Sequence, residues 1–158
     1  MLTENEVGRI WQRMVEAEVR SIYFADLAAR YTKRKQIITG VSLFLSSGAA
    51  ATVISTAPKW IPAILALVVA ILMAYSIAVN LDGRISTLSK LHYEWNRLDA
   101  EYERLWNHWN DSDAESALQK LIERGREMSE LATEMPYEKK RLEKWAQVVY
   151  SRFSQAKA

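Results

Sequence analysis

The pattern of apolar and charged positions divides the chain into one long uncharged run between two charged flanks. In the 45 residues at 37–81 the only charge is Lys59, near the middle of the run. This residue separates two apolar segments, 37–57 and 61–81, of 21 residues each. A helix of that length is roughly 31 Å long, which matches a hydrocarbon core of about 30 Å. The pattern predicts a transmembrane helical hairpin at residues 37–81.

An uncharged hairpin can also lie inside a soluble helical bundle, as in some pore-forming toxins before insertion. Such a bundle needs many amphipathic helices around the hairpin, and only about 110 residues remain outside the run. The first apolar segment follows 36 residues rich in charge, which is unlike a cleavable signal peptide. We therefore expect an all-helical membrane protein, with the lipid bilayer as its main partner.

Basic residues predict the orientation of the hairpin. Seven Lys or Arg residues precede the first apolar segment, three follow the second within 20 residues, and only Lys59 lies in the connection. Because basic residues next to membrane spans stay on the cytoplasmic side, we expect both termini to face the cytoplasm. The flanks at 1–36, 82–109 and 110–158 would then form cytoplasmic helices.

Residues 82–109 carry a heptad repeat. Its members recur at alternating spacings of three and four residues; they are Leu88, Leu91, Trp95, Leu98, Tyr102, Leu105 and Trp109. This spacing predicts a coiled-coil-like helix that packs along the repeat, which we call the heptad seam. Residues 1–36 have a looser apolar stripe, and residues 9–39 contain neither Gly nor Pro. We expect one amphipathic helix that runs from the N-terminal flank into the first apolar segment.

Acidic residues beside the heptad seam favour pairing within the chain. Glu94, Asp99 and Glu101 flank the seam, and in a parallel homodimer Glu94 would face Asp99 of the second copy. The N-terminal flank instead offers four arginines, which are Arg9, Arg13, Arg20 and Arg30. We expect the two flanking helices to pair through these charges. The alternative is that the charges are solvated, in which case they contribute little.

Residues 110–158 form a charge-balanced tail with nine basic and nine acidic residues. Ser112 and Glu115 have the spacing of a capping box that starts one helix, and Pro136 predicts a break before the last helix. That last helix carries an apolar stripe of Leu142, Trp145, Val149 and Phe153. Its basic residues can dock on anionic lipid, but we favour packing against the other cytoplasmic helices.

The composition and the lack of known motifs indicate neither catalysis nor nucleic-acid binding. The net charge is +2, and no basic run is as long as those of nucleic-acid-binding arms. The absence of cysteine excludes thiolate nucleophiles, thiolate metal sites and disulfides. His92 and His108 lie roughly 24 Å apart along one helix, too far to share a metal, and we interpret both as solvated. Glycine-rich phosphate loops, HExxH and Ser–His–Asp patterns are missing. We expect no enzymatic activity, no cofactor and no metal.

The candidate functional residues lie in the two apolar segments. The first segment gathers small and hydroxyl residues on one side, which we call the hydroxyl face: Thr39, Ser42, Ser46, Ala49 and Ala50. The second carries an alanine ladder, a spacing that lets helices approach closely: Ala66, Ala70, Ala74 and Ala78. Two interpretations stay open. Either the two small faces meet and lock the hairpin, or the alanine ladder packs while the hydroxyl face lines a water-filled path in an oligomer.

The order of these elements is distinctive over residues 5 to about 135. An amphipathic helix containing RSIYFADLAARY at 20–31 is followed by two closely linked apolar segments and a helix that reads HYEW at 92–95 and ERLW at 103–106. This layout resembles the SLATT group of two-transmembrane proteins in bacterial antiviral defence systems. The resemblance implies an inner-membrane effector or accessory that forms homo-oligomers and permeabilises the membrane when a partner protein of the defence system signals. It does not extend to the helix after Pro136.

Two functions fit these residues. The first is an oligomeric membrane effector whose assembly opens the bilayer. The second is a non-conducting anchor that recruits a cytoplasmic partner through its helical bundle.

The predicted topology can be tested with alkaline phosphatase, which is active only in the periplasm. Because both termini are expected to be cytoplasmic, the enzyme fused to the C-terminus should show no activity in cells. The same enzyme fused after Pro58 serves as the positive control. Strong activity of the C-terminal fusion would exclude the hairpin.

Overall fold

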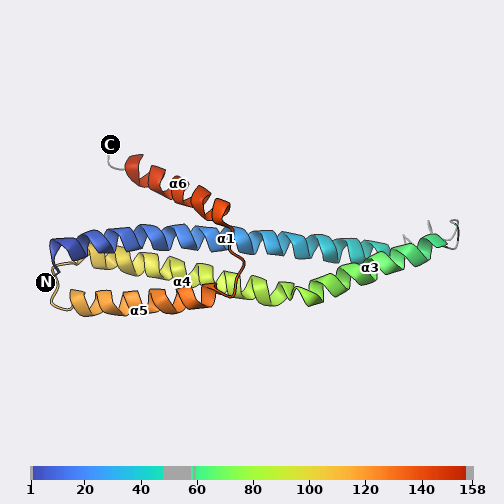
Figure 1. The fold of residues 1–158 in the computed structure, drawn as a ribbon, viewed down its shortest axis with the longest axis horizontal. Helices are drawn as coiled ribbons and strands as arrows, with labels where there is room; N and C mark the ends of the chain where they lie inside the picture. Colours follow the sequence, from blue (N-terminus) through green and yellow to red (C-terminus); the bar gives the residue numbers. More distant parts are fainter. Residues whose placement is uncertain (1, 48–57, 59, 156–158) are drawn as a thin grey trace. The chain divides into compact units, whose positions relative to one another are not determined.

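A computed structural model describes residues 2–47, 58 and 60–155 of the chain. The helices in these residues are α1 (Glu4–Ser46), α3 (Trp60–Ala78), α4 (Leu81–Asn107), α5 (Ala114–Ala132) and α6 (Lys139–Gln155) (Figure 1). The described residues contain no β-strand, which confirms the all-helical class for that part of the chain. Helix α1 is continuous for 43 residues, as the lack of Gly and Pro at 9–39 predicts.

The described chain forms two compact units. The first, which we call the bundle, comprises Met1–Leu27 and Thr87–Ala158, and the second, the apolar unit, comprises Ala28–Ser86. The unit boundaries therefore fall within α1 and α4, whereas the charge pattern placed them at residues 36 and 82. The reason is that the run of buried side chains in α1 ends at Ala28, so the charged residues that follow contribute no core to the bundle.

The heptad seam of α4 lies in the core of the bundle. Six of its seven members are at most 7% exposed: Leu88, Leu91, Trp95, Leu98, Tyr102 and Leu105. Helix α1 buries its own residues at spacings of four and three, and these are Ile10, Met14, Ala17, Ser21 and Phe24. Matching heptad spacings on two helices are typical of knobs-into-holes packing. The stripe on α1 was only loosely visible in the sequence because it includes the small residues Ala17 and Ser21.

The seventh member of the seam, Trp109, is 40% exposed and lies beyond the end of α4 at Asn107. The prediction that the seam helix continues to residue 109 is therefore wrong. The amides of His108 and Asp111 bond to the carbonyls three residues before them, at 3.2 and 3.1 Å, which forms turns instead of α-helix. This stretch contains Asn, Asp and Ser, residue types whose side chains can bond nearby backbone groups and which therefore favour turns over a helix interior.

The predicted capping box at Ser112 and Glu115 is also wrong. Helix α5 begins at Ala114, Asp113 is its N-cap, and this end has no side-chain cap hydrogen bond. The first helical bond runs from the Ala117 amide to the Asp113 carbonyl at 2.9 Å, which starts the helix one residue later than a cap at Ser112 requires.

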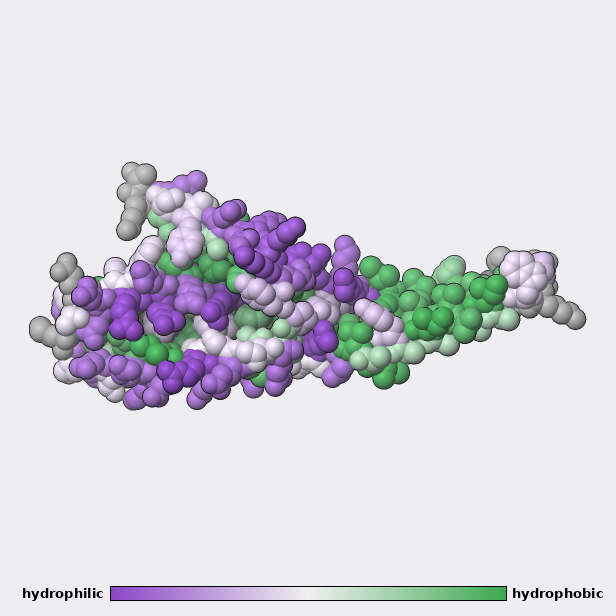
Figure 2. Space-filling model, in the orientation of Figure 1, coloured by the Kyte–Doolittle hydropathy of each residue, from purple (hydrophilic) through white to green (hydrophobic). Residues whose placement is uncertain are grey.

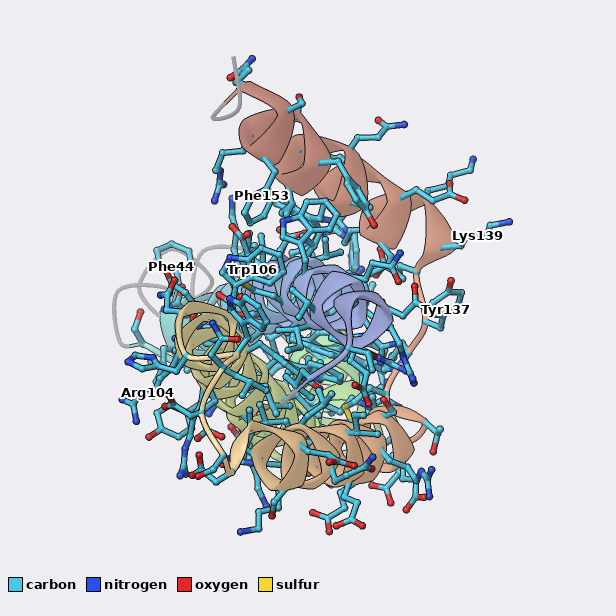
Figure 3. All side chains as sticks on the ribbon, turned by 90° about the vertical axis from the view of Figure 1, so that its left-hand side faces the viewer. Phe44, Arg104, Trp106, Tyr137, Lys139 and Phe153 are labelled. Atoms are coloured by element: carbon cyan, nitrogen blue, oxygen red, sulfur yellow. The ribbon has the colours of Figure 1, made fainter. Side chains whose placement is uncertain are left out.

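Helix α6 packs on α1, on the side opposite α4 and α5 (Figures 1 and 3). Val149 of α6 is fully buried against Val15 and Val19 of α1. Five partly buried side chains surround this cluster, namely Trp11, Ile22, Leu142, Ala146 and Phe153. The apolar stripe of α6 is thus used against another helix, which is the packing favoured from the sequence.

The apolar unit contains the end of α1, all of α3 and the start of α4. Asn80 lies between α3 and α4 with φ 48°, and its side-chain oxygen accepts a bond from the Gly83 amide at 3.2 Å. Asparagine is one of the few residues besides glycine that adopt this left-handed conformation readily. A Cβ at residue 83 would lie 2.4 Å from the Asn80 side-chain nitrogen, so a larger residue would force the Asn80 side chain to move and break its bond to the residue 83 amide.

Helix α3 is long and apolar enough to cross a membrane. The other predicted span, residues 37–57, is described only as far as residue 47, so its second half lies outside the described residues. The two-span hairpin accordingly stays a prediction. Figure 2 shows the hydrophobic side chains that gather over α3.

Replacing Leu98 with Asp tests the packing of the seam. The Leu98 side chain is fully buried, so a carboxylate there loses its water shell. We expect the free energy of unfolding to fall by about 3 kcal/mol or more, measured by chemical denaturation in detergent.

Asn96→Asp is the matched control, because Asn96 lies on the exposed side of the same helix and the variant introduces the same charge. Its unfolding free energy should stay within about 0.5 kcal/mol of the wild-type value. Equal losses in the two variants would contradict a packed seam.

Candidate functional site

The predicted hydroxyl face does not form one surface in the described residues. Thr39 is exposed, whereas Ser42 is only 6% exposed and its Oγ has no hydrogen-bond partner among the described residues. The Ser46 side chain, Ala49 and Ala50 lie outside the description. The less exposed face of this part of α1 consists of Ile38, Ser42 and Leu45. Ser42 therefore packs within the apolar unit, whereas Thr39 does not.

The alanine ladder lies on the outer surface of α3. All four of its residues are exposed: Ala66, Ala70, Ala74 and Ala78. The partly buried stripe of α3 consists of larger residues at heptad spacing, which are Leu65, Val69, Leu72, Ser76 and Val79. The interpretation that the two small faces meet inside the hairpin is therefore wrong for this ladder. The larger side chains occupy the contact within the unit, which leaves the alanines facing outward.

The outer surface of α3 is strongly apolar. None of its 19 residues is buried and none is charged. Leu67, Ile71 and Ile77 are 60, 59 and 79% exposed. A contiguous apolar surface of this kind is a binding surface for lipid or for another protein chain.

An ion pair that closes this unit joins α1 to the start of α4. The Lys35 ammonium bonds to the Asp82 carboxylate, so the charged residues on either side of the uncharged run meet in space. The pair is largely exposed, and exposed pairs contribute little to stability. It shows that the two ends of residues 37–81 lie next to each other.

In the bundle, Arg124 of α5 pairs with two of the three acidic residues beside the seam. Its guanidinium lies 2.5 Å from Glu94 and 3.0 Å from Glu101. The expectation that arginines of α1 would pair with these carboxylates is wrong. Arg20 of α1 instead lies over the Trp95 ring, 4.7 Å from its centroid. The sequence signal for Arg124 was weak, because a single arginine in a charged helix has many potential partners.

His92 is not a solvated histidine, contrary to the interpretation from the sequence. Its Nδ1 lies 3.1 Å from the Ser21 hydroxyl and 3.0 Å from the Ser21 carbonyl oxygen, so it links α4 to α1. His108 is exposed, with Nδ1 3.0 Å from the Arg104 carbonyl of its own helix. Among the described residues, no group of three His, Asp or Glu side chains is placed to hold a metal ion.

Two carboxylates of α1 hold α6 in place. Asp26 binds the Arg141 guanidinium and accepts a bond from Trp145 Nε1 at 3.2 Å. Two turns away along α1, Glu18 pairs with Arg152 at 2.5 Å. The hydroxyl of Tyr23 accepts a bond from the Glu138 amide at 2.9 Å just before α6 begins. These polar contacts lie on both sides of the apolar cluster around Val149 and fix the register of α6.

Asp99 is the most perturbed carboxyl group in the bundle. Burial raises its pKa to about 6, and the neighbouring carboxylates of Glu18 and Glu103 act in the same direction. The folded bundle therefore binds a proton at Asp99 more tightly than the unfolded chain does.

Comparisons with protein-family models, with curated proteins and with solved structures find no match for this chain.

Asp99→Asn tests the effect of this carboxyl group on stability. Because the pKa of Asp99 is higher in the folded state, the contribution of Asp99 to wild-type stability should be most favourable below about pH 4, fall between about pH 4 and 6, and stay low above that range. The full shift corresponds to about 3 kcal/mol, which solvent screening of this half-exposed group reduces to about 1 kcal/mol. The variant should be more stable than wild type by that amount at pH 8.

The measurement is chemical denaturation in detergent from pH 4 to 8, followed by circular dichroism. Asp111→Asn removes an exposed carboxylate from the adjoining turn and is the matched control. Parallel stability profiles of wild type and Asp99→Asn would show that Asp99 does not cause the pH dependence.

Proposed function

We propose that this chain is an effector of a bacterial inner membrane that self-associates in the bilayer and permeabilises it when a partner protein signals. The observation that carries the proposal is the exposure of α3, a helix of 19 residues without a charge and without a single buried side chain. A core helix of a soluble protein would be covered by its neighbours. A helix in lipid needs no such cover, because the hydrocarbon contacts its apolar side chains.

The ends of the apolar unit support a position across the bilayer. Lys33 and Arg34 are exposed near the Lys35–Asp82 pair, and basic residues of this kind stay on the cytoplasmic side. Trp60, at the other end of α3, is 62% exposed. Tryptophan is enriched at membrane–water interfaces. In this orientation the bundle and both termini are cytoplasmic.

The alanine ladder supports self-association. Its four residues are exposed on α3 and recur every four positions, which is the small-xxx-small pattern of close helix contacts in membranes. The larger residues of α3 already pack within the unit, so the ladder is free to meet the same ladder of a second copy.

A non-conducting anchor is the second candidate. It is favoured by Ser42, whose burial removes a hydroxyl from any water-filled path, and by the absence of charge from α3. In this function the bilayer holds the apolar unit while the bundle binds a cytoplasmic partner.

The double variant Ala70→Leu, Ala74→Leu tests self-association and leakage together. Two leucines overfill a close helix contact, and overpacking costs about 1–3 kcal/mol, so association should weaken about tenfold or more. Oligomer size is measured by light scattering in detergent, and permeabilisation by dye leakage from liposomes. We expect both to fall together.

Ile71→Leu with Met73→Leu is the matched control, because it alters exposed apolar residues of the same helix with little change in volume. A ladder variant that assembles and leaks like wild type would exclude the ladder as the interface. Wild-type protein that assembles but never releases dye, even with its partner present, would leave the anchor as the function.

A further inference from the structure

One exposed face of α1 in the apolar unit changes from basic to apolar within a single turn. Lys33 and Arg34 are exposed, and Ile37, Val41 and Phe44 follow them on the same face at spacings of three and four residues. These three apolar side chains are 56, 41 and 67% exposed. We call the five residues the basic–apolar stripe.

The spacing of the stripe matches the boundary between lipid headgroups and hydrocarbon. Arg34 precedes Ile37 by three residues, which is about 5 Å along the helix axis. The headgroup regions add about 10–15 Å to a hydrocarbon core of about 30 Å, so each headgroup layer is about 5–7 Å thick. If the hydrocarbon begins at Ile37, the first residue of the predicted span, then Lys33 and Arg34 lie at the depth of the lipid phosphates.

The charge of the apolar unit is strongly positive. Its described residues include one acidic residue, Asp82, and five basic residues, which are Arg30, Lys33, Arg34, Lys35 and Arg84. Their net charge is therefore +4. Because Asp82 is bonded to Lys35, the described part of this unit offers no second carboxylate to Lys33 and Arg34. An anionic group from another molecule is the complement of this end of the stripe.

Tyr31 holds the Arg34 side chain against the helix. The guanidinium lies over the Tyr31 ring, 5.9 Å from its centroid. A guanidinium over the face of a ring directs its N–H groups outward in its own plane, where they can donate to another acceptor. Arg34 is therefore already placed to donate to a group beside the helix.

The charges of the stripe favour lipid over a second copy of the chain. Copies in one bilayer share the same orientation, so a contact through this face would place Lys33 and Arg34 opposite the same residues of the second copy. Like charges that face each other oppose association. A phospholipid instead offers a phosphate to the basic end and an acyl chain to the apolar end.

We infer that the basic–apolar stripe binds an anionic phospholipid of the cytoplasmic leaflet, with its phosphate at Lys33 and Arg34 and an acyl chain along Ile37, Val41 and Phe44. Guanidinium groups bind phosphate oxygens through paired hydrogen bonds, and a lysine ammonium binds them as a point charge. The inference rests on the proposed position of the apolar unit in a bilayer. It requires neither self-association nor leakage.

The test measures lipid binding to the full chain in maltoside detergent by native mass spectrometry. Dioleoylphosphatidylglycerol should bind at least about fivefold tighter than dioleoylphosphatidylcholine, which has the same chains and a phosphate but no net charge. Glycerol 3-phosphate offers the phosphate without acyl chains. At equal concentration it should not displace the bound phosphatidylglycerol, because it leaves the apolar end of the stripe uncovered.

The double variant Lys33→Gln, Arg34→Gln removes both basic groups of the stripe. The preference for phosphatidylglycerol over phosphatidylcholine should fall to about twofold or less, with the helical content retained because both side chains are exposed. Lys139→Gln with Lys140→Gln is the matched control, since it removes the same charge from exposed residues of α6, the other basic helix considered for lipid binding. This control should keep the wild-type preference.

Four results would overturn the inference: equal affinity of wild type for the two lipids, displacement by glycerol 3-phosphate, an unchanged preference in the folded stripe variant, or loss of the preference in the α6 variant. A stripe variant that forms larger oligomers and keeps its lipid preference would assign this face to a second copy. Wild-type protein that binds phosphatidylglycerol selectively but neither assembles nor leaks would exclude the proposed effector function and retain the lipid site.

Discussion

The contact between α1 and α4 is the interaction on which the rest of the bundle depends. Each helix buries a heptad stripe, and side chains such as Leu98 on α4 and Ile10 on α1 are fully buried. Burial of apolar surface is the main favourable contribution to folding. Helices α5 and α6 are shorter and need a formed surface to pack on, because isolated helices of such length are marginal in water.

Polar contacts then determine where α5 and α6 lie on this pair. Arg124 places α5 over Glu94 and Glu101, while Asp26 and Glu18 place α6 by binding Arg141 and Arg152. Partly buried, charge-assisted contacts of this kind contribute geometry more than net stability. Burial raises the pKa of Asp99.

The apolar unit has the reverse arrangement of polar and apolar side chains to that of the bundle. Its apolar side chains are mostly on the outside, and its polar Ser42 is buried. In water that arrangement is unfavourable, whereas in hydrocarbon the exposed side chains are solvated and only polar groups need partners. This inversion is the physical reason for proposing a bilayer around α3, and it leaves the alanine ladder available to another helix.

The sequence alone determined the helical class, the continuity of α1, the apolar character of α3 and six members of the heptad seam. These features depend on local periodicity and on the absence of Gly, Pro and charge, which can be read without knowledge of neighbours. Only the tertiary structure decided which residues meet. Arg124 rather than the arginines of α1 pairs with Glu94, His92 contacts Ser21, and the alanine ladder faces outward. A helical repeat specifies which face of a helix is buried. Many helix pairings satisfy the same repeat, so the partner of that face depends on how all the helices pack together.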